Sequence, residues 1–402
     1  MALMFIFLHL LLLLYTCDFV RCLNVGINYG QIANNLPEAI QVVGLLESLR
    51  INRVKLYDSD PRVLKAFANT GVEFIIGISN EDVRKMKDAS TAETWVIQHV
   101  SDHLSAGTRI TSVTVGNEVL SGEDGVLMHD LVPAMQTVYE ALVKVGLDKQ
   151  IQVTTAHSVA ILETSYPPTD GAFRRDIVGK YIDPLLKFHS KTGSSFLINV
   201  YPFFAYKDDP TSVSLDYVLF NPDKGITDPN SNLHYDNMLF AQIDSVHSAI
   251  ERMGYKDIVV VVSETGWPSK GDSDEIGASL ENAATYNGNL IQKIGMSDPV
   301  GTPMKPSAPI DVYLFALFNE NMKPGPTSER NYGLLYPNRS SVYELPNEQK
   351  SNDHDDKILH YKYSSSSSPS VDWFFTIKVA LFMPLVAFLL VTELQVELWR
   401  YI

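Results

Sequence analysis

Short apolar stretches rich in β-branched residues alternate with longer amphipathic stretches through most of the chain. Eight apolar stretches have the length of single β-strands, at residues 24–29, 53–57, 73–78, 110–115, 152–156, 196–201, 258–263 and 310–317. Between them, apolar residues recur at helical spacing, for example at residues 38–49, 61–68, 130–145, 181–191, 236–253 and 277–294. This alternation predicts an α/β fold with parallel strands.

The number of strand–helix units favours a closed barrel. Strands such as 258–262 (IVVVV) are apolar on both faces, which is typical of buried parallel strands. Eight units can close into a (β/α)8 TIM barrel. The alternative is an open doubly wound sheet, which usually carries a glycine-rich phosphate-binding loop after its first strand. Here Tyr29-Gly30-Gln31 follows that strand without the motif, so we expect a barrel, with residues 23–345 as one domain.

Composition and charge remove several other classes of protein. Hydrophobic residues make up 45% and charged residues 20% of the chain, as in a packed globular protein. The formal net charge is −15, so the chain lacks the positive field that holds phosphate backbones, and we expect no binding to nucleic acid. The two cysteines, Cys17 and Cys22, cannot form a four-ligand zinc site or a disulfide scaffold.

The sequence predicts targeting signals at both ends of the chain. Residues 1–22 predict a secretory signal peptide, because the apolar run 5–15 is shorter than the ~20 residues that a membrane-spanning anchor needs. Residues 346–372 are polar and serine-rich, which predicts a linker. Residues 373–402 begin with an apolar stretch that could act as a signal for a GPI anchor or cross the membrane as a helix. The order of small residues, polar spacer and apolar tail favours GPI attachment within or near 364–370 and a location on the outer face of the plasma membrane.

In a TIM barrel, catalytic groups lie at the carboxyl ends of the strands. The residues at those positions are mostly acidic, amide or aromatic: Tyr29, Tyr57, Asp58, Ser79, Asn80, Asn117, Glu118, His157, Tyr201, Phe204, Glu264, Trp267, Asn319, Glu320 and Lys323. A pair of carboxyl groups can act as acid and nucleophile at an acetal carbon, and aromatic faces can stack on sugar rings. The alternative is that Glu118 and Glu264 only form ion pairs at the barrel rim.

Six motifs make the chain resemble the plant-type endo-1,3-β-glucanases of glycoside hydrolase family 17. They are 25–37 (VGINYGQIANNLP), 55–58 (KLYD), 115–118 (VGNE), 199–204 (NVYPFF), 263–269 (SETGWPS) and 315–326 (FALFNENMKPGP). The resemblance spans residues 25–345 and implies a (β/α)8 catalytic domain that cleaves internal 1,3-β-glucosidic bonds with retention, without a cofactor or metal. It places Glu118 at the general acid/base position and Glu264 at the nucleophile position.

The resemblance also implies a set of substrate-binding residues. These are Tyr57, Asn117, Glu320 and Lys323 on the family's active-site positions, Tyr201, Phe204 and Trp267 as cleft residues, and Tyr29 at the first strand end. We expect Lys323 to lie close to Glu264 and keep it charged, and this charge to raise the pKa of Glu118. Retention predicts that the two carboxyl groups lie about 5–5.5 Å apart.

Three readings of the function remain open on the sequence. The first is hydrolysis of a polysaccharide, 1,3-β-glucan, at the cell surface or wall by a monomeric enzyme. The second is a transglycosylase, which uses the same glutamates but passes the sugar to another sugar. The third is a non-catalytic glucan-binding wall protein. Many family members carry a cysteine-rich carbohydrate-binding module, and because no cysteine follows Cys22 we expect this chain to lack it.

Three weaker signals have simpler interpretations. His99 and His103 could face one metal from a helix turn, but an exposed helix face is the simpler reading. Residues 272–275 (DSDE) resemble the start of a calcium loop without its final glutamate, so we expect a solvated loop. Asn338-Arg339-Ser340 is a sequon, and in a secreted chain it predicts a glycan on Asn338.

Overall fold

The computed structural model describes residues 25–295 and 300–345. The predicted signal peptide, the linker and the C-terminal apolar segment lie outside the described residues. Within the part of the chain that the structure describes, no helix is long and apolar enough to cross a membrane.

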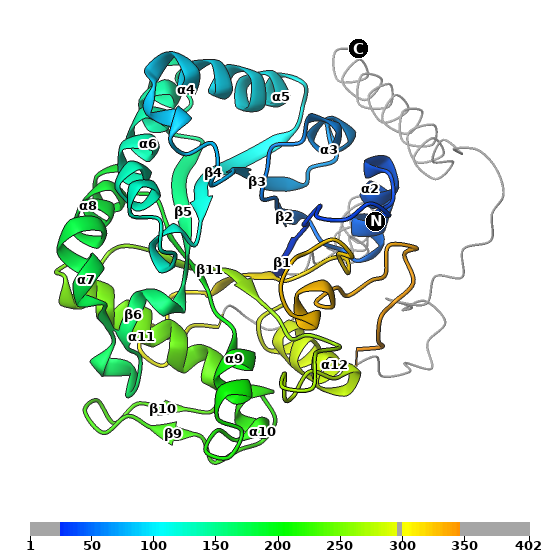
Figure 1. Ribbon diagram of the computed structural model, residues 1–402, viewed down its shortest axis with the longest axis vertical. Coiled ribbons are helices and arrows are strands. Elements are labelled where there is room, and N and C mark those ends of the chain that lie inside the picture. Colours follow the sequence, from blue (N-terminus) through cyan, green and yellow to red (C-terminus); the bar gives the residue numbers. More distant parts are fainter. Residues whose placement is uncertain (1–24, 296–299, 346–402) are drawn as a thin grey trace, which may run out of the picture. The chain divides into compact units, whose positions relative to one another are not determined.

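Eight parallel strands close into a barrel in the order β1-β12-β11-β8-β5-β4-β3-β2 (Figure 1). The strands are β1 (Val25–Asn28), β2 (Arg53–Lys55), β3 (Glu73–Ile78), β4 (Arg109–Asn117), β5 (Gln152–Ser158), β8 (Phe196–Asn199), β11 (Val260–Thr265) and β12 (Asp311–Leu314). Each corresponds to one of the eight apolar stretches of the sequence. The first and last strands pair in parallel, with Val25 opposite Val312, so the predicted TIM barrel is confirmed.

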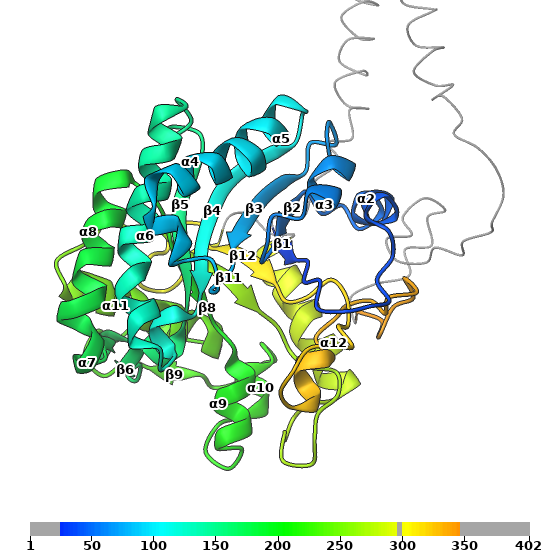
Figure 2. The same ribbon diagram turned by 45° about the horizontal axis from the view of Figure 1, so that its top comes forward.

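Helices lie outside the strands in both views (Figures 1 and 2). They are α2 (Ala39–Ser48), α3 (Pro61–Ala66), α4 (Ala89–Val96), α5 (Asp102–Ser105), α6 (Gly125–Lys144), α7 (Arg175–Ile177), α8 (Asp183–Thr192), α9 (Pro202–Asp208), α10 (Leu215–Val218), α11 (Met238–Arg252) and α12 (Leu280–Leu290). Side-chain caps begin several of them. Asp60, for example, accepts a hydrogen bond from the backbone of Arg62, and Pro61 occupies the first turn of α3.

Two short antiparallel hairpins lie outside the barrel sheet. One pairs β6 (Leu162–Thr164) with β7 (Ala172–Phe173), and the other pairs β9 (Ile226–Thr227) with β10 (His234–Tyr235). Both hairpins lie in the loops that follow β5 and β8, away from the closed sheet. They therefore extend connecting loops and leave the barrel topology unchanged.

A layer of buried side chains from five strands packs together inside the sheet. It consists of Ile75, Ala156, Leu197, Val261 and Tyr313, all at most 7% exposed. Side chains two residues apart on a strand share one face. Asn199 follows Leu197 by two positions, and Ser263 follows Val261 by two. Both polar side chains therefore lie on the same side as this layer, closer to the carboxyl ends of the strands. The apolar layer lies directly below the polar residues at the mouth of the barrel.

The interpretation of the histidine pair as an exposed helix face is wrong. His103 is 8% exposed, and the imidazole of His99 stacks on Trp95 at 5.1 Å between ring centroids while its Nδ1 lies 2.9 Å from Ser59 Oγ. Residues four apart share one side of a helix, and the buried His103 and the half-buried His99 show that this side packs against the protein. Among the described residues, no group of three or more histidine, cysteine or acidic side chains could hold a metal ion.

The expected solvated loop at residues 272–275 is also partly wrong. The carboxylate of Glu275 is 6% exposed and accepts hydrogen bonds from the backbone N–H groups of Asp272 (2.9 Å) and Ser328 (3.0 Å) and from the Ser328 hydroxyl. Asp272 accepts another from the backbone of Thr327 (2.9 Å). The two acidic side chains thus tie the loop after β11 to the loop after β12, which are neighbouring strands of the barrel.

Replacing Glu275 with alanine should destabilise the fold, because it leaves the Ser328 hydroxyl and two backbone N–H groups without their buried acceptor. We expect a loss of about 2 kcal/mol in the free energy of unfolding. Thermal or denaturant unfolding measures it. Asp274, an exposed neighbour in the same loop, is the control, and Asp274→Ala should leave the unfolding midpoint unchanged. Equal effects of the two substitutions would contradict this role.

Candidate active site

A break in the pairing register brings Glu118 to the mouth of the barrel. β4 pairs with β5 through Thr114, and the register shifts before Asn117. Gly116 lies between them with φ of +68°, and a Cβ there would sit 2.8 Å from the Val119 side chain, so glycine is required. Glu118 itself has φ of 54°, in the left-handed region. The sharp turn directs the Glu118 carboxyl group away from the sheet and into the site.

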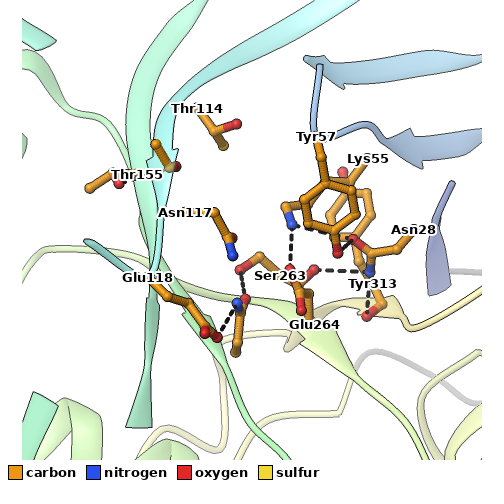
Figure 3. A network of polar contacts seen from close by, with 12 residues as sticks. Asn28, Lys55, Tyr57, Thr114, Asn117, Glu118, Thr155, Ser263, Glu264 and Tyr313 are labelled. Atoms are coloured by element: carbon orange, nitrogen blue, oxygen red, sulfur yellow. Dashed lines mark hydrogen bonds and ion pairs between the residues drawn. The ribbon is translucent and has the colours of Figure 1, made fainter. Parts of the chain in front are cut away.

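A second register shift delivers Glu264. The pairing of β11 with β8 slips between Val262 and Glu264. In a regular strand Ser263 and Glu264 would point to opposite faces, but an irregularity of this kind re-aims a side chain. Both residues consequently face the polar centre of the barrel mouth (Figure 3).

Glu264 lies in a buried nest of donors. Its Oε1 is 2.8 Å from the ammonium group of Lys55, which is 1% exposed, and its Oε2 accepts a hydrogen bond of 2.9 Å from the Tyr201 hydroxyl. Burial by itself raises the pKa of a carboxyl group. Here the charge of Lys55 and the hydrogen bonds from Lys55 and Tyr201 outweigh burial, and the pKa of Glu264 lies below its usual value. Glu264 is therefore kept ionised.

The surroundings of Glu118 shift its pKa in the opposite direction to that of Glu264. Its Oε1 accepts a hydrogen bond of 2.8 Å from the side-chain amide of Asn199. Burial first, and then the negative charge of Glu264, raise the pKa of Glu118 above its usual value, although the Asn199 bond and the more distant charge of Lys55 lower it. One carboxyl group held ionised beside another that tends to stay protonated is the arrangement of a nucleophile and a general acid.

A third carboxyl group, that of Glu320, is buried beside the first strand. It is 3% exposed and accepts a hydrogen bond of 2.8 Å from the backbone N–H of Ile32. Gly30 makes room for it, because a Cβ there would lie 2.4 Å from its Oε2. Burial raises the pKa of Glu320 above its usual value. Glu320 thus holds the loop after β1 against the loop after β12.

A hollow of about 280 Å³ opens beside these groups. Its lining residues come from β2, β3, β4 and the loops after β2 and β3, and they are Lys55, Tyr57, Ile78, Ser79, Asn80, Glu81, Thr114, Gly116 and Asn117. The backbone of Asn117 is held by two hydrogen bonds to the side chain of Asn80, at 2.8 and 3.0 Å. The side-chain oxygen of Asn117 has no partner among the described residues. This oxygen is also buried, so a polar atom of a residue that lines the hollow is left unsatisfied there.

Comparison with known proteins shows which family the chain belongs to. The family model for Glycosyl hydrolases family 17 matches residues 25–346. The chain is 57% identical over 346 residues to Glucan endo-1,3-beta-glucosidase 14 of Arabidopsis thaliana, covering 86% of this chain and 87% of that relative. It is 44% identical over 322 residues to Glucan endo-1,3-beta-D-glucosidase of Olea europaea, covering 80% and 69%.

Among solved structures, CJP38, a beta-1,3-glucanase and allergen of Cryptomeria japonica pollen, aligns with a TM-score of 0.76 at 38% identity, covering 80% of this chain and 98% of that chain. The chain belongs to glycosyl hydrolases family 17. The resemblance expected from the six motifs is thereby confirmed.

The structure of this family 17 chain brings several of the predicted site residues together. Tyr57 and Tyr201 lie beside Glu264, and the Tyr57 hydroxyl donates to Asn28 Oδ1 at 3.0 Å. Phe204 is 38% exposed and meets the ring of Tyr201 edge-on at 5.5 Å. Its accessible ring suits stacking on a sugar.

The expectation that Lys323 neutralises Glu264 is wrong. The ammonium group of Lys323 pairs with Glu329 at 3.1 Å and lies over the ring of Phe315, and Lys55 is the cation on Glu264. Lys55 is the last residue of β2, so it lies before the positions beyond the strand ends that predict the site. A buried ammonium group needs a buried carboxylate, but β2 contains both Arg53 and Lys55, and its sequence does not tell which of the two is buried.

Three other residues read from strand ends do not lie in an open cleft. Trp267 is completely buried and donates its indole N–H to the backbone of Gly277 at 2.9 Å. His157 is also completely buried and stacks on Phe196 at 4.7 Å. Tyr29 is 2% exposed and packs edge-on against Phe318. The sequence locates a strand end but does not tell whether the next side chain turns into the mouth or under a loop.

Replacing Lys55 with methionine tests the ion pair. Without the ammonium charge the pKa of Glu264 rises, and a nucleophile must be ionised to react. The acidic limb of the pH dependence of kcat/KM for glycoside hydrolysis should therefore move to higher pH by about one unit or more. Lys323→Met is the matched control and should leave that limb in place. A shift in the Lys323 variant alone would contradict the assignment.

Proposed function

We propose that this chain hydrolyses internal 1,3-β-glucosidic bonds of 1,3-β-glucan with retention of configuration. One observation carries the proposal: the pKa of Glu264 is lowered and that of Glu118 is raised in one site. Retaining glycosidases need such a pair of carboxyl groups. The printed names of the relatives, glucan endo-1,3-beta-glucosidases, support the bond that is cleaved.

The reaction takes two steps in this site. Glu264 attacks the anomeric carbon while the Glu118 carboxyl group gives its proton to the departing glycosidic oxygen, which leaves a covalent glycosyl-enzyme. Glu118, now ionised, takes a proton from water, and the resulting attack on the anomeric carbon releases Glu264. Lys55 and the Tyr201 hydroxyl hold the Glu264 carboxylate from two sides, one on each oxygen, and so orient it for attack.

The protonation states limit the pH range of the reaction. Activity falls at low pH as Glu264 becomes protonated, which happens only below its usual pKa because that pKa is lowered. Activity falls at high pH as Glu118 loses its proton, which happens above its usual pKa because that pKa is raised. The working range is the interval between these two values.

The substrate-binding residues surround the two carboxyl groups. Phe204 offers its exposed ring to a glucose face, and Asn117 lines the hollow beside the two carboxyl groups. Glu320 and Lys323 contribute from the loop after β12. Both carboxyl groups of the pair come from one chain, so we propose that a monomer is active.

Transglycosylation remains the alternative activity, because it uses the same two glutamates with a sugar hydroxyl in place of water. Incubation with a linear 1,3-β-glucan separates the possibilities. Shorter oligosaccharides indicate hydrolysis, chains longer than the donor indicate transfer, and an unchanged glucan indicates binding only. NMR of the first product should show the β-anomer, and a first-formed α-anomer would overturn the retaining mechanism.

Single substitutions separate the roles of the two glutamates. Glu264→Ala should abolish turnover, because no glycosyl-enzyme can form. Glu118→Ala should lose activity on glucan, by about 100-fold or more, but recover much of the first step on aryl glucosides with good leaving groups, which need little proton donation. The measurement is the rate on both substrates. Near-normal glucan hydrolysis by either variant would rule out these roles.

We further propose that the enzyme is secreted and held at the cell surface. The support is the sequence at both ends: the signal peptide at residues 1–22 and the apolar segment at 373–402, with GPI attachment near residues 364–370. Asn338 is exposed in a turn in which its Oδ1 accepts hydrogen bonds from Ser340, so it is accessible as a glycan acceptor. The cell wall is the second location consistent with secretion.

A phosphatidylinositol-specific phospholipase distinguishes the two kinds of anchor. Treated cells should release the enzyme into the medium, because that lipase cuts a GPI anchor and leaves membrane-spanning helices intact. Release is followed by activity or by an antibody against the barrel. Retention in the membrane, with residues 392–402 still detectable by antibody, would establish the transmembrane alternative instead.

A further inference from the structure

Ser263, the residue before the nucleophile, contacts two buried asparagine side chains. Its hydroxyl donates a hydrogen bond of 2.7 Å to Asn199 Oδ1, and its backbone carbonyl accepts one of 3.1 Å from Asn28 Nδ2 (Figure 3). Ser263 and Asn28 are completely buried, and Asn199 is 2% exposed. None of the three is among the residues that the sequence assigns to the site.

The side-chain amides of Asn199 and Asn28 present opposite ends to Ser263. Asn199 directs its oxygen to Ser263, which leaves its N–H₂ group to donate to Glu118 at 2.8 Å. Asn28 directs its N–H₂ group to three backbone carbonyls, those of Ser263, Tyr313 and Leu314. An amide has one donor end and one acceptor end, so a partner that holds one end decides what the other end offers.

The side-chain oxygen of Asn28 consequently points toward the residues around the nucleophile Glu264. It accepts hydrogen bonds from Lys55 Nζ at 3.3 Å and from the Tyr57 hydroxyl at 3.0 Å. Lys55 in turn pairs with Glu264. Ser263 therefore lies between two chains of hydrogen bonds, one that ends on the acid/base and one that ends on the cation of the nucleophile.

We propose that Ser263 is a positioning residue whose hydroxyl holds the Asn199 amide with its donor end on Glu118. The proposal rests on the hydrolysis proposed above and adds the residue that keeps the acid/base carboxyl group in place. The backbone carbonyl of Ser263 has a parallel role toward Asn28, but any residue at this position supplies a carbonyl. Only the hydroxyl depends on serine.

Loss of the hydroxyl leaves the buried oxygen of Asn199 without a donor. The amide can then turn over and accept a hydrogen bond from the neutral Glu118 carboxyl group, an arrangement that favours the protonated form. Glu118 also senses the charges of Glu264 on β11, Lys55 on β2 and Glu329 in the loop after β12. The substitution changes none of these three, so a shift in the titration of Glu118 reports the amide.

The test is the pH dependence of kcat/KM for Ser263→Ala on a soluble 1,3-β-gluco-oligosaccharide. We expect the alkaline limb, which follows Glu118, to move up by about half a pH unit to one unit, and the acidic limb, which follows Glu264, to stay in place. Ser263→Thr keeps a hydroxyl and should retain the wild-type limb. Thermal unfolding checks that each variant is folded.

A double-substitution cycle separates this role from a merely structural one. In an Asn199→Ala background there is no amide to hold, so adding Ser263→Ala should shift the alkaline limb no further. Equal shifts with and without Asn199, or a kcat/KM that falls equally at every pH, would overturn the proposal. If the Thr variant does not fold, the cycle alone decides.

The proposed function and this inference fail in distinguishable ways. Wild-type protein without hydrolysis of any 1,3-β-glucan would overturn the function. In that case, NMR titration of the Glu118 carboxyl carbon in wild type and Ser263→Ala still measures the amide's effect. Hydrolysis with a normal wild-type pH profile, together with an unmoved alkaline limb in Ser263→Ala, would overturn the inference and leave the function standing.

Discussion

A lysine and a glutamate meet at 2.8 Å inside the barrel, with 1% and 8% of their side chains exposed, and the chemistry of the site depends on this pair. Either charge alone would be costly at such burial, and removing one partner leaves the other uncompensated. The surroundings complete the pair: Tyr201 donates to the second oxygen of Glu264, and Asn28 accepts from Lys55. With both oxygens bound, the Glu264 carboxylate is ionised and has a fixed orientation, as a nucleophile requires.

The second carboxyl group takes its character from the first. Because Glu264 remains charged, its field adds to burial in raising the pKa of Glu118, so one ion pair indirectly produces a general acid. The backbone serves the same end. A left-handed turn after Gly116 and a register shift in β11 are departures from regular strands, and each aims one carboxyl group at the mouth.

The loops around the mouth are held by carboxylates of a different kind. Glu275 and Glu320 are both buried and accept hydrogen bonds from backbone N–H groups, and each joins two loops at the carboxyl ends of the strands. They fix the rim through these hydrogen bonds, and neither forms an ion pair with another described residue. The site thus contains acidic residues of one type in separate roles, and only the contacts of each residue tell them apart.

The sequence alone determined the barrel, its eight strands and the two glutamates, because strand length, apolar periodicity and short motifs are local properties. Only the tertiary structure decided that Lys55 rather than Lys323 pairs with Glu264, that Trp267 and His157 turn into the core, and that Ser263 orients two amides. Lys55 and Glu264 are 209 positions apart. Barrel closure brings them together, and no local pattern records which distant side chains will share one low-dielectric space or which end of an amide will face them.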